Sequence, residues 1–406
     1  MAQLNRYRTG NQALVREINL SAIMNRLHEQ APLSRSALAE MTGLNKTTVS
    51  SLVEELINQQ FVREAGFDTA GAGRPARLLE FNPNAGCIIS AEIGVDFVSV
   101  ICANFATNII WRIEENTEQV SDWQHILDKL LLLFNQAIEA ACNLCGPVLG
   151  LAIGVPGLVD QKTGTLLFAP NLHWENVPIG TVLRNTFNFP VFVDNEANMA
   201  ALGEYYFGVA RNYTDILYVS GGGGVGGGIV QGGKLAGGAT GFAGEVGHMT
   251  IDPNGPLCSC GNRGCWETFI NQKALFQRIQ KTPNNGYENS LINNSELTVT
   301  TVLNAARTGD TVVLNTLEKT GDYLGIGIAS LINILNSELV ILGGIYNTLG
   351  EFLLPSVTKK LNQNALQWNA NATKVVLAQQ GSDACVKGGL ARVYQAILTQ
   401  PGTITN

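Results

Sequence analysis

Four side chains of types that bind metals lie within eighteen positions of this 406-residue chain: His248, Cys258, Cys260 and Cys265. Glycines between them allow the backbone to turn tightly. Three thiolates and a neutral imidazole form the ligand set of a closed zinc site that leaves no position open for water. The spacing therefore predicts one structural Zn²⁺ per chain, held by these four residues.

The alternative for the same cysteines is a small disulfide knot. Residues 1–8 lack the apolar core of a signal peptide, and apolar runs such as 130–134 are too short to span a bilayer. We therefore expect no membrane association and a cytoplasmic location, where reducing conditions favour metal binding over disulfides. Cys142 and Cys145 have the spacing of a redox pair, but we interpret them as the end of a buried helix.

Composition is that of a globular protein with two or three domains, with 45% hydrophobic and 15% charged residues. The net charge of −7 argues against nucleic acid as a partner, but the charge is unevenly distributed. Residues 1–82 carry nine Lys or Arg against eight Asp or Glu, a net of +1, and the other residues carry −8. Any contact with DNA is therefore expected in the first 82 residues.

These 82 residues have the pattern of a winged helix-turn-helix. Apolar residues recur at helical spacing over 13–27, and Ser34 and Asn45 are suited to cap two further helices. Residues 42–44 (Thr-Gly-Leu) form the tight turn, and residues 71–77 place Arg74 on a hairpin tip that can enter a minor groove. A small helical interaction domain is the alternative, but the order of elements favours DNA binding. The predicted DNA contacts are Arg35, Lys46, Thr47, Thr48, Ser50 and Arg74.

Beyond a short joint at 82–84, a strand–turn–strand pattern occurs twice, at 87–100 and 215–230. Helices and strands follow each copy: a helix at 121–142 and strands at 150–155 and 191–193, then a helix at 321–336 and a strand at 339–342. This order predicts an α/β body of two similar lobes with a cleft between them. Glycine in the turns allows a phosphate to approach the backbone, but it equally allows tight packing.

Several motifs of the body occur in an order that resembles the ROK family of repressors, open-reading-frame proteins and sugar kinases. They are 155–160 (Val-Pro-Gly-Leu-Val-Asp), 170–172 (Pro-Asn-Leu), 195–198 (Asn-Glu-Ala-Asn), 244–248 (Gly-Glu-Val-Gly-His), the cysteine cluster and 265–268 (Cys-Trp-Glu-Thr). Residues 42–51 and 248–267 are similar to one subgroup, the bacterial xylose repressors. The resemblance covers the chain nearly end to end and implies an actin-like, ribonuclease-H-like ATPase fold behind the DNA-binding head.

The resemblance also implies a division of the chain and a sugar site. The head would span 1–82, the first lobe 83–195 with a helix at about 384–400 packed back on it, and the second lobe, with the zinc site, 196–383. Amide and carboxylate groups in the cleft would bind sugar hydroxyls, and His248 would use one ring nitrogen for zinc and the other for the sugar or a carboxylate. The implied sugar-binding residues are Asn171, Asn195, Glu196, Glu245, His248 and Glu267.

Three positions depart from the kinases of the family. Glu196 stands where the kinases have the catalytic Asp, and its extra methylene displaces the carboxylate. Asp96 and Gly223 stand where the two phosphate loops of the kinases have Thr. We therefore expect no enzyme activity.

These expectations combine into one hypothesis. The chain is predicted to be a sugar-responsive repressor, a homodimer or higher oligomer, that leaves its operator when a sugar, by resemblance xylose, binds in the cleft. Two alternatives stay open: a ROK-type sugar kinase with an appended DNA-binding domain, and a repressor controlled by a protein partner.

Overall fold

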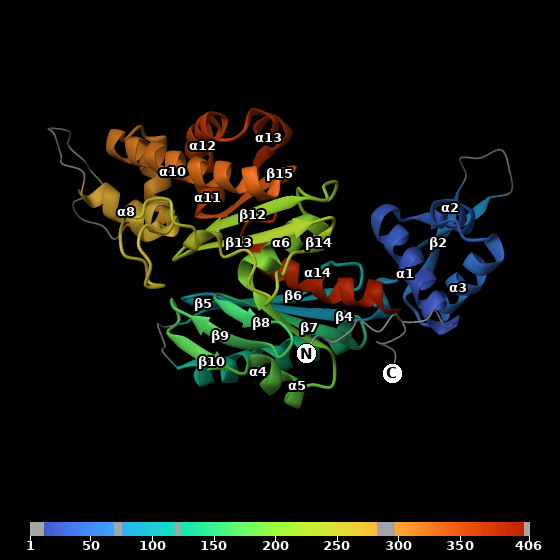
Figure 1. Ribbon diagram of the computed structural model, residues 1–406. Helices are drawn as coiled ribbons and strands as arrows, with labels where there is room; N and C mark the ends of the chain where they lie inside the picture. Colours follow the sequence, from blue (N-terminus) through green and yellow to red (C-terminus); the bar gives the residue numbers. More distant parts are fainter. Residues whose placement is uncertain (1–11, 69–74, 118–121, 282–296, 402–406) are drawn as a thin grey trace, which may run out of the picture.

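A computed structural model describes residues 12–68, 75–117, 122–281 and 297–401. The predicted wing residue Arg74 lies outside these ranges. The chain folds into a small N-terminal head and a larger body of two stacked α/β lobes (Figure 1). Among the described helices, none combines the length and apolar character needed to cross a bilayer.

The head contains three helices and a small sheet. The helices are α1 (Gln12–Gln30), α2 (Arg35–Thr42) and α3 (Lys46–Asn58), and the sheet has the order β1 (Leu33–Ser34), β3 (Ala76–Phe81), β2 (Val62–Asp68). Both predicted caps are confirmed: Ser34 Oγ accepts from the Ala37 N–H, and Asn45 Oδ1 accepts from the Thr48 N–H. The expected apolar stripe of the first helix was only partly right. Ile23 and Leu27 are buried, whereas Ile18 is 57% exposed.

The first lobe is built on a five-stranded sheet of order β11-β7-β4-β5-β6. Strands β4 (Cys87–Ile93), β5 (Phe97–Asn104) and β6 (Ile109–Asn116) form an antiparallel meander, and β7 (Val148–Val155) and β11 (Val191–Asn195) extend it in parallel. The other elements are α4 (Trp123–Leu144), α5 (Ile179–Thr186) and an antiparallel sheet of β8 (Leu158–Asp160), β9 (Thr165–Ala169) and β10 (Trp174–Val177). This second, small sheet was not predicted.

The second lobe repeats the arrangement with the order β14-β13-β12-β15-β16. Strands β12 (Ile216–Gly221), β13 (Val225–Gln231) and β14 (Lys234–Leu235) form its meander, and β15 (Leu339–Gly344) and β16 (Lys374–Leu377) its parallel edge. The helices are α7 (Glu267–Ile270), α8 (Gln272–Lys281), α9 (Val299–Arg307), α10 (Thr311–Leu335), α11 (Ile345–Thr348), α12 (Gly350–Asn364) and α13 (Gln367–Ala372). α10 begins ten residues earlier than expected, because Asp310 accepts from the N–H groups of Val312 and Val313.

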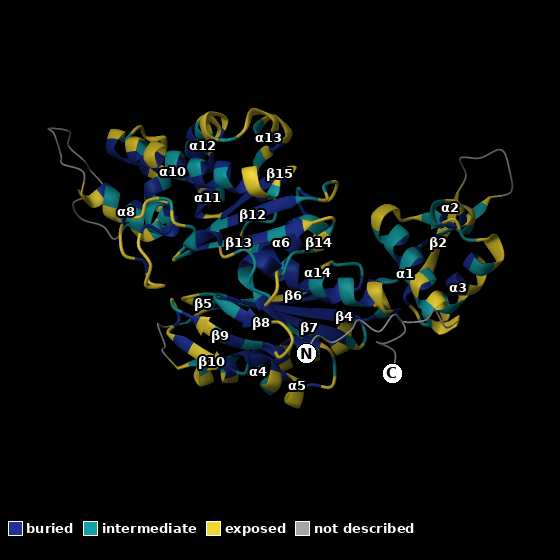
Figure 2. Cartoon of the chain, viewed as in Figure 1, coloured by how far each residue is buried: buried dark blue, intermediate teal, exposed yellow. Residues whose placement is uncertain are grey.

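Helices α6 (Glu196–Phe207) and α14 (Ala384–Thr399) lie between the two sheets (Figure 1). α14 packs on β4 and β7 of the first lobe, while α6 packs on β12 and β13 of the second. The two helices approach closely because Gly388 has no side chain: a Cβ there would lie 1.5 Å from the Met199 carbonyl oxygen. The central strands β4, β5, β7, β12 and β15 are buried along most of their length, whereas the edge strand β6 is not (Figure 2).

Head and first lobe share one hydrophobic core. Phe61 and Phe81 of the head have ring centroids 5.3 and 5.2 Å from that of Phe105, and Phe105 lies 5.2 Å from Tyr394 of α14. The joint between the two parts is only a short 3₁₀ turn at Pro83–Ala85. The head therefore packs directly against the body through this shared core.

One disulfide, between Cys87 and Cys145, was not anticipated from the sequence. Cys87 opens β4 and Cys145 follows α4, and both are buried in the first lobe. Cys142 is exposed and free, so it forms no pair with Cys145.

Candidate metal centre and ligand cleft

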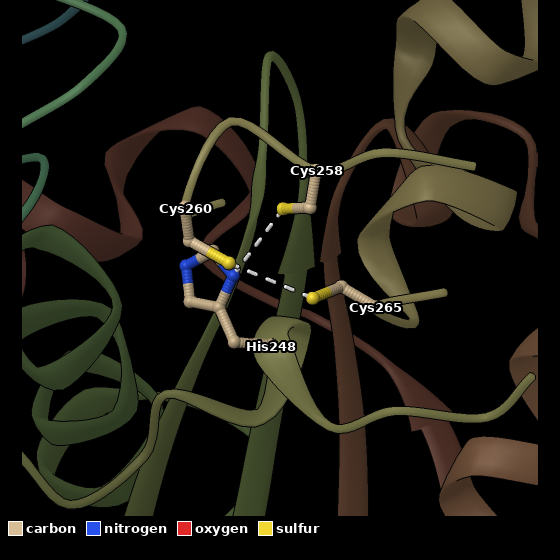
Figure 3. A group of neighbouring side chains, drawn as sticks. All are labelled: His248, Cys258, Cys260 and Cys265. Carbon is tan, nitrogen blue, oxygen red and sulfur yellow. Dashed lines mark hydrogen bonds between the residues drawn. The ribbon is translucent and has the colours of Figure 1, made fainter. Parts of the chain in front are cut away.

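The four predicted zinc ligands lie together at the edge of the second lobe. Their ligand atoms all lie within 4.8 Å of one another. His248 Nδ1 is 3.6 Å from Cys258 Sγ, and Cys260 Sγ is 3.7 Å from Cys265 Sγ (Figure 3). A tetrahedral ion with metal–sulfur bonds of about 2.3 Å places two sulfurs about 3.8 Å apart, and a sulfur and a nitrogen about 3.6 Å apart. The separations of 3.6 and 3.7 Å fit a tetrahedral zinc ion.

The backbone conformation around the cluster explains why glycines occur between its cysteines. The Cys258 N–H donates to the Asn262 carbonyl and the Gly261 N–H to the Cys258 carbonyl, which closes a tight loop between the ligands. Gly264 has φ +68°, and a Cβ there would lie 1.5 Å from the Asp252 carbonyl oxygen. Only glycine fits at this point, next to Cys265.

Glu267 joins the cysteine cluster to the cleft. The Cys258 thiol donates to Glu267 Oε1 at 2.8 Å, and His248 Nδ1 is 3.7 Å from the same oxygen. Burial, together with this carboxylate, raises the pKa of Cys258. The other oxygen of Glu267 faces Gly224, where a built Cβ would be 3.2 Å from Oε2 and 3.4 Å from Asn171 Nδ2. Asn171 of the first lobe and Glu267 of the second thus meet across Gly224.

The first turn of α6 holds the next group of predicted residues. Asn195 caps this helix: its Oδ1 accepts from the N–H groups of Ala197 and Asn198, and its Nδ2 donates to the Gly157 carbonyl. Its side chain is therefore largely occupied by structural hydrogen bonds. Glu196 Oε2 is buried and has no hydrogen-bond partner among the described residues, and the same holds for Asn198 Oδ1.

The pKa values of several carboxyl groups in the cleft are raised, which favours their neutral form. Burial raises the pKa of Glu196 to about 8 and that of Glu92, on β4, to about 7, because both lose solvation. The carboxyl of Glu245 also has a raised pKa, chiefly from burial. At neutral pH the carboxyl of Glu196 is therefore largely protonated, and it can donate as well as accept hydrogen bonds.

A cavity of about 10 Å³ lies where the two lobes approach. It is lined by Asn195 and Asn198 on one side and by Gly241 and Glu245 on the other. Two of the six predicted sugar-binding residues therefore line this cavity. The other four do not line it: Glu196 is on the same helix turn as Asn198, Asn171 and Glu267 lie at Gly224, and His248 belongs to the cysteine cluster.

Two further cleft residues were missed from the sequence. Asn198 lies one helical turn after Asn195, so the spacing of the two amides within residues 195–198 was an available signal. Glu92 lies on a different strand, and its approach to Glu196 follows only from the sheet order.

The predicted DNA-contacting residues of α3 lie at its N-terminal end. Lys46, Thr47 and Ser50 are exposed there, and Thr48 is partly covered and donates its N–H to the cap. Arg35 on α2 instead contacts carboxylates of the head, Glu64 at 3.4 Å and Glu54 at 3.8 Å. The structure therefore brings four of the six predicted residues together on one helix end and places Arg35 in an ion-pair network.

Comparison with known proteins agrees with this architecture. The ROK family model matches residues 88–396, and the IclR helix-turn-helix domain model matches residues 19–66. The xylose repressor of Caldicellulosiruptor bescii is 36% identical over 395 residues, which cover 97% of this chain and 99% of that protein.

Solved structures give the same picture. A ROK family transcriptional regulator, a homologue of the E. coli MLC protein, has a TM-score of 0.84 and 26% identity, covering 95% of this chain and 97% of that one. A ROK family glucokinase from Streptomyces griseus, in complex with glucose and AMPPNP, has a TM-score of 0.66 and 31% identity, covering 76% of this chain and 99% of the kinase.

The chain therefore belongs to the ROK family. Its helix-turn-helix head, together with its match to repressors over nearly their full length, makes it a sugar-responsive transcriptional repressor.

Proposed function

We propose that this repressor binds operator DNA through the N-terminal end of α3 and releases it when xylose binds between the lobes. The observation that carries the sugar site is the pair of buried, unpartnered oxygens on α6, Glu196 Oε2 and Asn198 Oδ1. Buried acceptors normally have a hydrogen-bond partner, and sugar hydroxyls are hydrogen-bond donors. The choice of xylose rests on the similarity to xylose repressors.

A structural Zn²⁺ held by His248, Cys258, Cys260 and Cys265 belongs to the same proposal. The ion would hold the loop that carries Glu267 and His248 toward the cleft, and it has no part in chemistry because four protein ligands fill its coordination sphere. With Nδ1 directed at the sulfurs, the other ring nitrogen of His248 is available to a sugar or a carboxylate.

Helix α6 offers a direct route from sugar to head. Its first turn carries Glu196 and Asn198, and its last turn carries Tyr206. The Tyr206 ring lies 5.4 Å from that of His28 on α1 of the head. A helix of twelve residues is about 18 Å long and moves as one body, so a shift at the sugar end displaces the contact with the head. Sugar binding lowers operator affinity to the extent that it favours the displaced state.

The kinase alternative has less support. A Cβ built at Gly223 would lie 4.0 Å from Val95 Cγ2 and 3.8 Å from Asn171 Nδ2, so the two loops that correspond to the kinase phosphate loops face each other closely. Asp96 adds a negative charge beside them. We therefore propose that the chain does not phosphorylate sugars, and that the cleft has kept its binding function only.

Band shifts with DNA from upstream of the chain's own gene test this proposal. We expect retarded DNA with the full-length protein and release on addition of xylose, but no such release with the Glu196→Ala variant.

Absence of binding to any neighbouring promoter would refute the operator assignment. Release by glucose or N-acetylglucosamine, but not by xylose, would change only the proposed identity of the inducer. If no sugar released the DNA, control by a protein partner would be favoured. ATP consumption with xylose in a coupled assay would favour the kinase.

The oligomeric state is part of the same proposal. One head covers a single half-site, so we propose a homodimer that binds a pseudo-palindromic operator. Sedimentation of the protein with and without a duplex operator measures the number of chains per site.

A further inference from the structure

A second cavity, of about 830 Å³, lies at the junction of head and body. Its wall on the head side includes His28 and Glu80, and its wall on the body side includes Tyr206, Arg211 and Lys387. It lies at the opposite end of α6 from Glu196, so it is separate from the sugar cleft. The proposed function gives it no role.

Positive charge in this junction cavity is only partly compensated. Arg63 and Glu80, both in the wall, form an ion pair at 2.6 Å, and Glu29 pairs with Arg26 at 2.6 Å. Arg211 and Lys387 form no ion pair with any carboxylate within the described ranges of the chain. The cavity thus has two uncompensated cations in a protein of net charge −7.

The positive charge affects the pKa of the neighbouring His28. His28 lies between the rings of Tyr206, 5.4 Å away, and Tyr394, 5.1 Å away. Burial lowers its pKa to about 4, and the positive charge of Arg211 contributes to the shift. The imidazole is therefore neutral at physiological pH, and the cationic character of the cavity comes from Arg211 and Lys387.

Lys387 is held in place from the body side. Its ammonium group donates to Gln380 Oε1, while Gln380 Nε2 donates to the Phe207 carbonyl at 2.6 Å and the Gln380 N–H to Glu204 Oε1 at 2.7 Å. An ammonium group has three N–H donors, so Lys387 keeps donors for a ligand. Because Glu204 and Phe207 belong to α6, the cation is fixed to the helix that leads to the sugar cleft.

We propose that the junction cavity binds a small phosphomonoester, with Arg211 and Lys387 on its phosphate. A phosphomonoester carries about two negative charges at neutral pH, which matches two uncompensated cations better than a single carboxylate does. The volume exceeds that of phosphate alone, and Thr107, Asn108 and Gln379 offer polar groups to the remainder of the molecule. Through its position between α1 and α6, the ligand would fix the head relative to the body and so modify the repressor activity on which this inference rests.

Calorimetry on the full-length protein in a phosphate-free buffer tests the inference without DNA. The probes are a hexose 6-phosphate, AMP, inorganic phosphate and the unphosphorylated hexose. We expect one site per chain for a phosphomonoester, and we expect Arg211→Gln and Lys387→Gln each to weaken it at least tenfold. The hexose phosphate and AMP arms distinguish a sugar from a nucleotide source. Lys359→Gln, an exposed lysine on α12, is the matched control and should change nothing.

Several results would overturn the inference. They are the absence of binding by both phosphomonoesters at millimolar concentration, equal binding by the unphosphorylated hexose, and affinity unchanged in both variants. Competition with xylose would place the ligand in the sugar cleft instead. Weaker operator binding by the variants, with no phosphomonoester bound by the wild type, would assign the cations to DNA. Retained xylose binding shows that the variants are folded, and failure of xylose binding in the wild type concerns the proposed function alone.

Discussion

Replacing Glu196 by glutamine should stabilise the protein, and the gain should increase with pH. Burial raises the pKa of this carboxyl to about 8, from an ordinary value of 4.5 in the unfolded chain. Between these two values the folded state binds more protons than the unfolded state, so Glu196 lowers the stability of the wild type progressively as the pH rises. Glutamine has nearly the same shape and no charge, so it removes this penalty.

The size of the effect follows from the shift. One pKa unit corresponds to about 1.4 kcal/mol, so at pH 7 the 2.5 units above 4.5 amount to roughly 3 kcal/mol. Some solvent reaches the side chain, which reduces the effect, and about 1–3 kcal/mol is expected. Below about pH 3.5 the carboxyl is largely protonated in both states, and the difference between variant and wild type should become small.

Thermal unfolding of wild type and Glu196→Gln at pH 5, 6, 7 and 8 measures this. We expect the melting temperature of the variant to exceed that of the wild type by a few degrees at pH 8 and by little at pH 5. Glu318→Gln, on the exposed side of α10, is the control and should show no such trend. A difference that is constant across the pH range, or a variant less stable than wild type at pH 8, would refute the argument from burial.

Three further predictions concern metal and DNA. Cys265→Ser should reduce bound zinc, measured by elemental analysis, from one equivalent to a small fraction and lower the melting temperature; a wild type without metal would contradict it. Gly264→Ala should have a similar effect on zinc content, because its Cβ would collide with the Asp252 carbonyl, and unchanged zinc would show that the loop adapts. Lys46→Ala should weaken binding to specific and random DNA alike and reduce the salt slope by about one, whereas Lys319→Ala on α10 should not.

Features set by local sequence were predicted well. Ser34 and Asn45 cap helices as expected because capping depends on residues within one turn. The grouping of the four candidate metal ligands was also predictable, since these residues lie close together in the sequence. The repeated strand–turn–strand pattern gave the two lobes, and the structure shows them as two sheets of the same order.

Features set by contacts between distant segments were not predicted. Glu92 and Glu196 lie more than one hundred positions apart and meet only through the sheet order, so their raised pKa values had no local signal. Asn195 was assigned to sugar, but capping α6 occupies most of its amide. Ile18 fits a helical stripe, yet it stays exposed because the buried face of α1 begins only at Leu20.

The core shared by head and first lobe limits how such a repressor can acquire new targets. An isolated head would expose the faces of Phe61 and Phe81 that Phe105 and Tyr394 cover, and it would lose apolar burial that a domain of this size needs. The head is therefore not a transferable module: a graft onto another body fails unless the matching surface, with Phe105 and Tyr394, is transferred with it. New operator preferences arise more readily by substitutions on the exposed end of α3, which takes no part in that core.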